Sequence, residues 1–203
     1  MGNPSIAQAP AHIDRHEDLR QRLTLLKPED TVRGVILNGV MEAVRVLGDE
    51  TLVRQCLDVV GEKRLVDFFS YPSHKHLQLI YTAAGLLDAR YGSFEKALWL
   101  MGYHGGKNFL SSTPGKVLLL GQGSFKRLLE AVPTAFSVGG NGLKSEVRWT
   151  GPTSAVFILD RDFIPPAYTE GTLQSLEISK VKGLRVRWRP TETLVGEYEL
   201  TWE

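Results

Sequence analysis

The feature that most constrains the fold is a change in the spacing of apolar residues past the middle of the chain. Before about residue 140, apolar residues recur at steps of three and four, which places them on one face of a helix. From Leu143 to Trp149 they alternate with polar residues, which indicates a strand with one buried face. The spacing therefore predicts a helical half followed by a sheet.

Caps and breaks divide the helical half into about five helices. Lys27-Pro28 with the acidic pair that follows is typical of a helix start, because Pro fits the first turn and acidic side chains suit the positive end of the helix dipole. The expected helices run from Pro28 to Gly48, from Glu50 to Gly61, from Pro72 to Gly92, from Ser93 to Pro114 and from Lys116 to Pro133, the last one interrupted at Gly121-Gln122-Gly123.

The second half predicts two strands, a helix and two more strands. We expect an α+β fold in which the helical half packs on one four-stranded antiparallel sheet with the order strand–strand–helix–strand–strand. Residues 1–22 are expected to be a mobile leader, and residues 23–203 a single α+β domain. The strands are expected over residues 143–149, 154–159, 184–189 and 197–202, and the helix over residues 165–180.

Composition excludes several classes of protein. The net charge of +1 argues against a general nucleic-acid binder, and no apolar run approaches the roughly 18 residues of a membrane span. The N-terminus lacks the pattern of a secretory signal. The single cysteine, Cys56, lies in an apolar pattern, which favours a buried and inert thiol. We therefore expect a cytoplasmic protein.

The central helix contains unusual glycines. Gly102, Gly105 and Gly106 each cost about 1 kcal/mol of helix stability relative to Ala. One interpretation is close packing of this helix against another element. The other is a ligand that lies against the bare backbone beside Tyr103 and His104.

The histidines do not form a metal-binding pattern. His74 and His76 are two residues apart, so on a helix they point away from each other, and they are expected to lie on the surface or to cap the helix. His12 and His16 fall in the leader. His104 lies beside Tyr103 and Lys107, as either a packed residue or a functional one.

Two other patterns have simpler explanations than catalysis. The Gly121-Gln122-Gly123 run lacks the Lys-Ser/Thr of a phosphate-binding loop, and no G-x-S-x-G elbow of a serine hydrolase is present. Arg185, Arg187 and Arg189 line one face of a predicted strand. They can hold a phosphate or an acidic partner, or they can pair with glutamates of the next strand.

Several runs of the sequence resemble a known family. The runs TVRGVILNGVMEAVRVLG, RLVDFFSYP, PPAYTEGTLQSLE and EYELTW are similar to a paralogous family of uncharacterised myxobacterial proteins of about this length, from Leu23 to Trp202. The order of elements also resembles a wider group, which contains 4-vinyl-reductase-like regulatory domains, TRAPP trafficking subunits and haem-based nitric-oxide sensors. This likeness implies a ligand or partner in a cleft between helices and sheet, and a homodimer.

The haem branch of this group implies particular residues. It implies an axial histidine on a helix before the sheet, where His104 is placed, and a Tyr-x-Ser-x-Arg motif that binds the haem propionates. The nearest match is Lys144-Ser145-Glu146-Val147-Arg148, which has no tyrosine two residues before the serine.

The leading hypothesis is a non-enzymatic regulatory or adaptor domain that binds a small apolar or amphipathic ligand, or a partner protein, in the cleft. No catalytic residue, metal site or cofactor is expected under it. One alternative is an enzyme that uses His104 with Tyr103 or Lys107, and another is a haem or chromophore sensor. The expected ligand-binding residues are Trp99, Tyr103, His104, Lys107, Trp149 and Tyr168.

Overall fold

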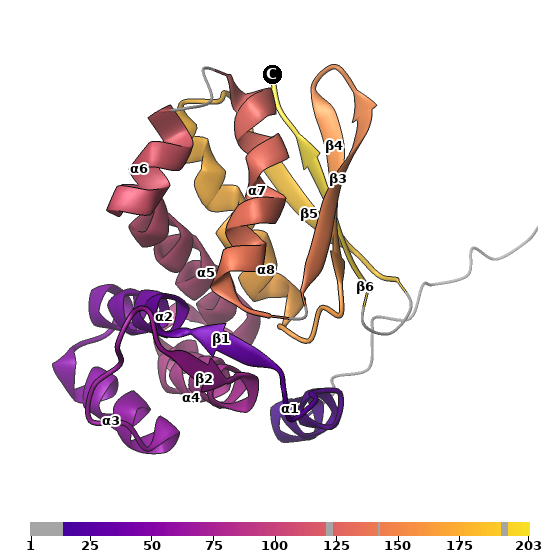
Figure 1. The fold of residues 1–203 in the computed structure, drawn as a ribbon. Helices are drawn as coiled ribbons and strands as arrows, with labels where there is room; N and C mark the ends of the chain where they lie inside the picture. The colour runs from indigo at the N-terminus through magenta and orange to yellow at the C-terminus, as the bar shows by residue number, and fades with distance from the viewer. Residues whose placement is uncertain (1–13, 121–123, 142, 192–194) are drawn as a thin grey trace, which may run out of the picture.

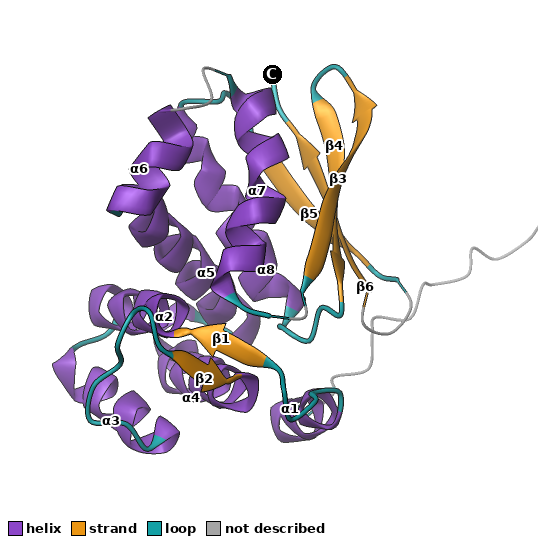
Figure 2. Ribbon diagram, in the orientation of Figure 1, coloured by secondary structure: helices purple, strands orange, loops and turns teal. Residues whose placement is uncertain are grey.

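The computed structural model describes residues 14–120, 124–141, 143–191 and 195–203 (Figure 1). Helices precede a four-stranded sheet, and one helix separates the two strand pairs (Figure 2). The elements are α1 (Arg15–Thr24), β1 (Thr31–Arg33), α2 (Gly34–Leu47), α3 (Glu50–Val60), β2 (Ser70–Pro72), α4 (Ser73–Tyr91), α5 (Phe94–Ser111), α6 (Thr113–Leu120), α7 (Phe125–Gly139), β3 (Lys144–Gly151), β4 (Ser154–Asp160), α8 (Pro166–Gln174), a 3₁₀ turn (Ser175–Ser179), β5 (Arg185–Arg189) and β6 (Val195–Thr201).

The predicted sheet is confirmed. Its strand order is β3-β4-β6-β5, and every neighbouring pair is antiparallel. Phe157, Tyr198 and Leu200 on its inner face are fully buried. Helices α5 to α8 lie on this one side of the sheet (Figure 1), so the alternation in the sequence indicates which face of each strand is covered.

The buried residues form two cores rather than one. The first lies among α1 to α4 and the first half of α5, which we call the helical lobe. The second lies between α7, the sheet and the ends of α5 and α8, and we call α6, α7 and the sheet the sheet lobe. Helices α5 and α8 contribute residues to both cores and join the lobes.

Glycines allow α5 and α8 to approach closely. A Cβ atom added to Gly102 would lie 2.0 Å from the backbone oxygen of Tyr168, and one added to Gly171 would lie 2.0 Å from the backbone oxygen of Trp99. A Cβ atom on Gly106 would lie 2.2 Å from the hydroxyl of Ser175. The packing interpretation of the glycines in this helix is therefore correct for Gly102 and Gly106.

The predicted helix start at Lys27-Pro28 is wrong. Helix α2 begins at Gly34, and the preceding residues form β1, which pairs with β2. The carboxylate of Asp30 accepts a hydrogen bond from the Lys27 backbone N–H at 2.7 Å and holds a turn there. This turn and the strand pairing replace the first helical turn that the Pro and the acidic pair suggested.

The predicted end of a helix at Pro133 is also wrong. Residues 113–120 and 125–139 form two helices, α6 and α7, and α7 continues through Pro133. An internal proline costs about 3 kcal/mol. The buried Leu129 and Val132 and the half-buried Phe136 lie in α7 on both sides of it and pack into the core of the sheet lobe. This burial offsets the lost backbone hydrogen bond.

Helix α1 covers part of the segment expected to be a leader. Asp14 caps it, and the side chain of Arg15 forms an ion pair with Asp88 at 2.8 Å. The partly buried Leu19 and Leu23 pack against the core of the helical lobe. Residues 1–13 lie outside the described residues.

Side chains of α8 cover the outer edge of strand β5. The backbone N–H groups of Val186 and Trp188 donate to the side chains of Gln174 and Glu170 at 3.2 and 3.0 Å. This edge is therefore closed to pairing with another strand.

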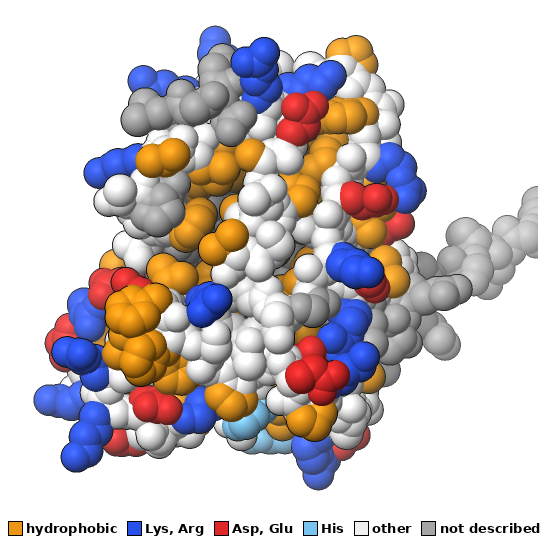
Figure 3. Space-filling model, viewed as in Figure 1, with side chains coloured by type: hydrophobic (Ala, Val, Ile, Leu, Met, Phe, Trp, Pro, Cys, Tyr) orange, Lys and Arg blue, Asp and Glu red, His pale blue; other side chains and the backbone are white. Residues whose placement is uncertain are grey.

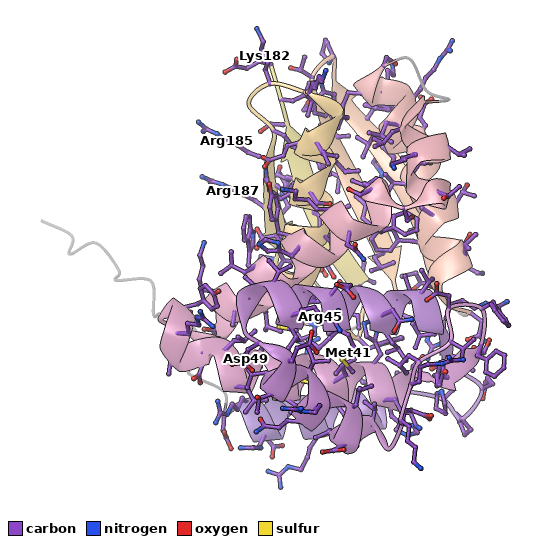
Figure 4. All side chains as sticks on the ribbon, turned by 90° about the vertical axis from the view of Figure 1, so that its left-hand side faces the viewer. Met41, Arg45, Asp49, Lys182, Arg185 and Arg187 are labelled. Atoms are coloured by element: carbon purple, nitrogen blue, oxygen red, sulfur yellow. The ribbon has the colours of Figure 1, made fainter. Side chains whose placement is uncertain are left out.

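The basic row on β5 is only partly paired. Arg189 forms an ion pair with Glu199. Figure 4 shows Arg185 and Arg187 extending away from the ribbon, and within the described residues neither has an ion pair. The ion-pair interpretation therefore holds for Arg189 alone.

Candidate functional site

A pocket of about 200 Å³ lies between the two lobes. Helices α2 and α4 contribute walls from the helical lobe, α7 and the end of β4 contribute walls from the sheet lobe, and α5 and α8 complete it. Figure 3 shows hydrophobic side chains in the hollow between α6 and α7. The pocket is thus lined by residues of both lobes and of the two helices that join them.

The lining of this pocket is apolar and uncharged. Val35, Ile36, Leu159 and Ile164 are among its aliphatic residues, and no Asp, Glu, Lys or Arg lines it within the described part of the chain. Such a surface favours the uncharged part of a ligand, because a buried charge without a partner is costly.

His76 is the buried polar residue that distinguishes the lining. It lies in the first turn of α4 and is only 6% exposed. Its Nε2 atom is buried without a hydrogen-bond partner among the described residues. Burial lowers the pKa of His76 to about 4, so the imidazole is neutral at physiological pH.

Tyr168 lies beside His76. The two rings meet edge to face with centroids 6.2 Å apart, and both line the pocket. Burial raises the pKa of Tyr168 well above its ordinary value. The described residues offer its hydroxyl no hydrogen bond, and a Cβ atom on Gly105 would lie 3.5 Å from this oxygen. Tyr168 is the predicted ligand-binding residue that lines the pocket.

Four other predicted residues form a separate surface row along α5. The rings of Trp99 and Tyr103 stack with centroids 5.4 Å apart, and Lys107 lies over the Tyr103 ring. The Tyr103 hydroxyl donates to Glu177 at 2.6 Å, and this bond, with burial, raises the pKa of Tyr103 to about 12.

His104 also lies in this row and contacts the edge of the Tyr103 ring. Burial, with a smaller contribution from Lys107, lowers the pKa of His104. The sixth predicted residue, Trp149, lies in the sheet lobe against Trp202 and Lys126. The six residues therefore do not gather in one place.

The prediction of a surface or capping role for His76 is wrong, whereas His74 is exposed as expected. The sequence contained a signal for this burial. His76 lies four residues before Ile80 and seven before Ala83, which are both fully buried, so it belongs to the apolar face of its helix.

An ion pair links the lobes beside the pocket. Arg161, which follows β4, donates through both terminal nitrogens to the two carboxylate oxygens of Asp30, each at 2.8 Å. Asp30 is 3% exposed, and the hydrogen bond from Arg161 lowers its pKa. Asn141, which follows α7, accepts from the Thr31 backbone N–H and donates to the backbone oxygen of Glu29. Both contacts hold the segment before β1 against the sheet lobe.

A second buried carboxylate lies behind the pocket wall. Asp162 accepts a hydrogen bond from the Tyr198 hydroxyl, and burial raises the pKa of Asp162 to about 6. Arg22 of α1 lowers this pKa in part and donates to the backbone oxygens of Phe163 and Ile164 at 3.3 and 3.1 Å. Unlike His76, Asp162 does not line the pocket.

Solved structures share this fold. An H-NOX protein from K. algicida in the Fe(II) unliganded state has 14% identity and a TM-score of 0.65 over 84% of this chain and 96% of that chain. An H-NOX protein from S. oneidensis has 11% identity and a TM-score of 0.67 over 84% and 96%. An oxygen-binding H-NOX domain related to soluble guanylate cyclases has 11% identity and a TM-score of 0.65 over 84% and 95%. At these identities the likeness establishes the fold alone, and it confirms the resemblance to the haem-based sensor group at that level.

No helix within the described residues is both long and apolar enough to cross a membrane. No curated protein matches the chain. A family model described as "Protein of unknown function (DUF2378)" matches residues 25–203, and the chain therefore belongs to that family.

Proposed function

We propose that this protein is a sensor domain that binds a small, uncharged and largely apolar ligand between its two lobes. The observation that carries this proposal is the pocket of about 200 Å³, whose described lining is uncharged. An apolar cavity of about 150 Å³ is enough to bind benzene. The pocket therefore accommodates a molecule of one or two rings.

The fold supports a sensor more than an adaptor or an enzyme. One structural neighbour is named as an oxygen-binding H-NOX domain related to soluble guanylate cyclases. Another neighbour is described in terms of heme distortion in the H-NOX family. Of the three hypotheses drawn from the sequence, these neighbours favour the haem or chromophore sensor, because H-NOX domains have this fold. This likeness supports ligand sensing by the present chain.

The residues of the pocket nevertheless do not fit a haem. Drug-sized ligands occupy pockets of about 300–1,000 Å³, and a porphyrin is at least of that size, so this pocket is too small for it. A haem also carries two propionate groups, and the described lining offers no Lys or Arg to pair with them. His104, the expected axial residue, does not line the pocket. The neutral imidazole of His76 could bind a metal ion, but the described residues place no cluster of metal-binding side chains around it.

The position of the pocket suggests how binding is reported. The lining comes from both lobes, so a bound ligand contacts Val35 and Ile36 on one side and Phe136 and Leu159 on the other. A ligand shifts a conformational equilibrium only by its difference in affinity for the two states. Here that difference arises because relative movement of the lobes breaks the contacts on one side.

Naphthalene is a suitable first probe. We expect it to bind the full-length protein, to raise the melting temperature, and to shift the backbone amide resonances of Gly39, Gly105 and Gly139, which line the pocket. Gly39→Leu places a side chain in the pocket from α2 and is expected to abolish binding. Val46→Leu adds apolar atoms to the exposed side of the same helix and serves as the matched control.

Two results contradict the proposal. One is the absence of any naphthalene shift at the pocket glycines, and the other is equal binding by the Gly39→Leu and Val46→Leu variants. Titration with haemin tests the haem reading, and we expect no absorbance band that depends on His76. A stoichiometric band that His76→Phe removes would show that the pocket opens to accept the porphyrin.

The remaining hypotheses stay predictions. An enzyme that uses His104 predicts an activity that His104→Ala removes without loss of stability. The homodimer predicts a mass of two chains in solution, which sedimentation measures directly.

A further inference from the structure

We propose that the ligand carries an uncharged polar head, a hydroxyl or an amide, that hydrogen-bonds to His76 and Tyr168, while its apolar body fills the rest of the pocket. This inference rests on the proposed function and names the class of ligand. It follows from two buried polar side chains that meet in the pocket and lack partners in the part of the chain that the structure describes.

The imidazole of His76 has unused hydrogen-bonding capacity. A neutral imidazole offers one N–H donor and one nitrogen acceptor. Nε2 of His76 is buried without a partner, and burial alone accounts for the lowered pKa of this group, with no contribution from a charge or a hydrogen bond. A buried polar group without a partner is destabilising, and a ligand that pairs with it removes this cost.

The hydroxyl of Tyr168 also has no hydrogen bond within the described residues. Burial is the sole cause of its raised pKa. The hydroxyl of Thr172 donates to the backbone oxygen of Tyr168 at 3.0 Å. Because the rings of His76 and Tyr168 are in edge-to-face contact, the two unpaired groups belong to one end of the pocket.

The polar head must be uncharged. The neutral His76 cannot compensate a carboxylate or a phosphate, and the described lining has no cationic side chain. Two arginines near the pocket are already engaged: Arg161 holds both oxygens of Asp30, and Arg22 pairs with Asp18. An anionic head would therefore be buried without a counter-charge, at a large cost.

The apolar body has room to extend away from this polar end. A smaller hollow of about 50 Å³ lies against the main pocket. The two share Phe109, Phe136 and Thr172, and the far side of the smaller hollow is formed by Leu118 and Leu173. Beyond the shared residues the lining is aliphatic except for Ser175, whose hydroxyl donates to the backbone oxygen of Thr172, and this suits an aliphatic or aromatic tail.

Three probes of one shape test the inference. Naphthalene has the apolar body alone, 1-naphthol adds an uncharged hydroxyl, and 1-naphthoate adds a charge. We expect the wild-type protein to bind 1-naphthol about tenfold more tightly than naphthalene, as one buried hydrogen bond implies, and to show no binding of 1-naphthoate.

Substitutions identify the groups that make the difference. His76→Phe keeps a ring in place, and Tyr168→Phe removes only the hydroxyl. Each is expected to reduce the preference for 1-naphthol to less than threefold while naphthalene still binds. Tyr103→Phe is the matched control, because it removes a tyrosine hydroxyl from α5 outside the pocket. It is expected to leave the preference unchanged.

The nitrogen resonances of His76 give a second measurement on the unaltered protein. They are expected to shift with 1-naphthol and not with naphthalene. This readout does not depend on whether a variant folds.

The outcomes separate this inference from the proposed function. Equal binding of naphthalene and 1-naphthol overturns the polar head and leaves the pocket as a site for apolar ligands. Equal shifts of the His76 nitrogen resonances with naphthalene and 1-naphthol also overturn the polar head. In that case the imidazole bonds to a water molecule rather than to the ligand hydroxyl. Tight binding of 1-naphthoate overturns the uncharged character of the site. Failure of every probe to bind overturns the proposed function and this inference together.

Discussion

The two sides of the boundary between the lobes use glycine in opposite ways. On the side that we call the closed seam, Gly102 and Gly171 bring α5 and α8 so near that an added Cβ atom would overlap the facing helix, and neither glycine lines the pocket. Gly106 lies where the two sides meet, because its Cβ atom would overlap Ser175 and the residue also lines the pocket. On the other side, the open seam, Gly39 and Gly105 line the pocket, and a Cβ atom on either meets no heavy atom closer than 3.5 Å.

This difference shows that α5 packs tightly against α8 through one face and lines the pocket with another. Gly102 and Gly106 lie one helical turn apart and face α8, whereas Gly105 meets the facing helix only at ordinary contact distance. The closed seam fixes α5 to α8, so movement of the lobes is expected at the open seam, where we propose that the ligand binds.

The largest effect is expected at the closed seam. Gly171→Ala places a Cβ atom 2.0 Å from the backbone oxygen of Trp99, so the two helices must separate. We expect the free energy of unfolding to fall by about 3 kcal/mol or more. Denaturant unfolding measures this change, and a loss below about 1 kcal/mol would show that the seam is not tightly packed.

A second prediction uses the two buried titratable groups near the open seam. The folded pKa of Asp162, about 6, lies above its ordinary value of 3.8, so its contribution to stability is full below pH 4 and is lost as the pH rises through 6. The folded pKa of His76, about 4, lies below its ordinary value of 6.5, so its contribution is full above pH 6.5 and is lost as the pH falls through 4. The two groups therefore oppose each other between pH 4 and 6.5.

Substitution separates the two contributions. Relative to wild type, Asp162→Asn should gain stability as the pH rises from 4 to 7, and His76→Phe should gain stability as the pH falls over the same range. Each difference is on the order of 3 kcal/mol across the range. Unfolding curves at several pH values measure both slopes, and slopes of equal sign would contradict the assignment of one or both pKa shifts.

The ion pair across the open seam gives a smaller effect. Arg161→Met removes both hydrogen bonds to the buried carboxylate of Asp30 and leaves that carboxylate without its arginine. We expect a loss of about 2 kcal/mol, less than for a fully buried pair because the side chain of Arg161 is 19% exposed. The control is the double variant Arg161→Met with Asp30→Asn, which should recover part of this loss. If the loss in the double variant equals the sum of the losses in the two single variants, the two side chains are not coupled.

The smallest effect is expected from the matched glycine of the open seam. A Cβ atom on Gly39 would lie 3.9 Å from its nearest neighbour, the backbone oxygen of Gly105, so Gly39→Ala adds no overlap and improves helix propensity. We expect a gain of up to about 1 kcal/mol in the free energy of unfolding, together with weaker naphthalene binding in the narrowed pocket. A loss as large as that of Gly171→Ala would remove the distinction between the seams.

Most of the fold could be predicted from the sequence because each element carries its own periodic pattern. The alternation from Leu143 to Trp149 marks β3, and Gly61 and Gly92 end α3 and α4 in the left-handed conformation that glycine favours. The failures occurred where a distant partner outweighed a local signal. Thr31–Arg33 is a strand because Ser70–Pro72 pairs with it.

The site was less predictable than the fold. Of the residues predicted to bind a ligand, Tyr168 lines the pocket, whereas Trp99 and Tyr103 lie in a row outside it. The position of His76 at a helix start favours a surface or capping role, but its spacing to Ile80 places it on the buried face.

The sequence by itself determined the order of the main helices, the four strands of the sheet and the covered face of that sheet. These properties depend on neighbours within a few residues, which local spacing records. Only the tertiary structure decided which glycines seal α5 against α8 and which line a pocket, and that His76 meets Tyr168 there. The physical reason is that packing brings together residues nearly a hundred positions apart, and a single sequence contains no record of such contacts.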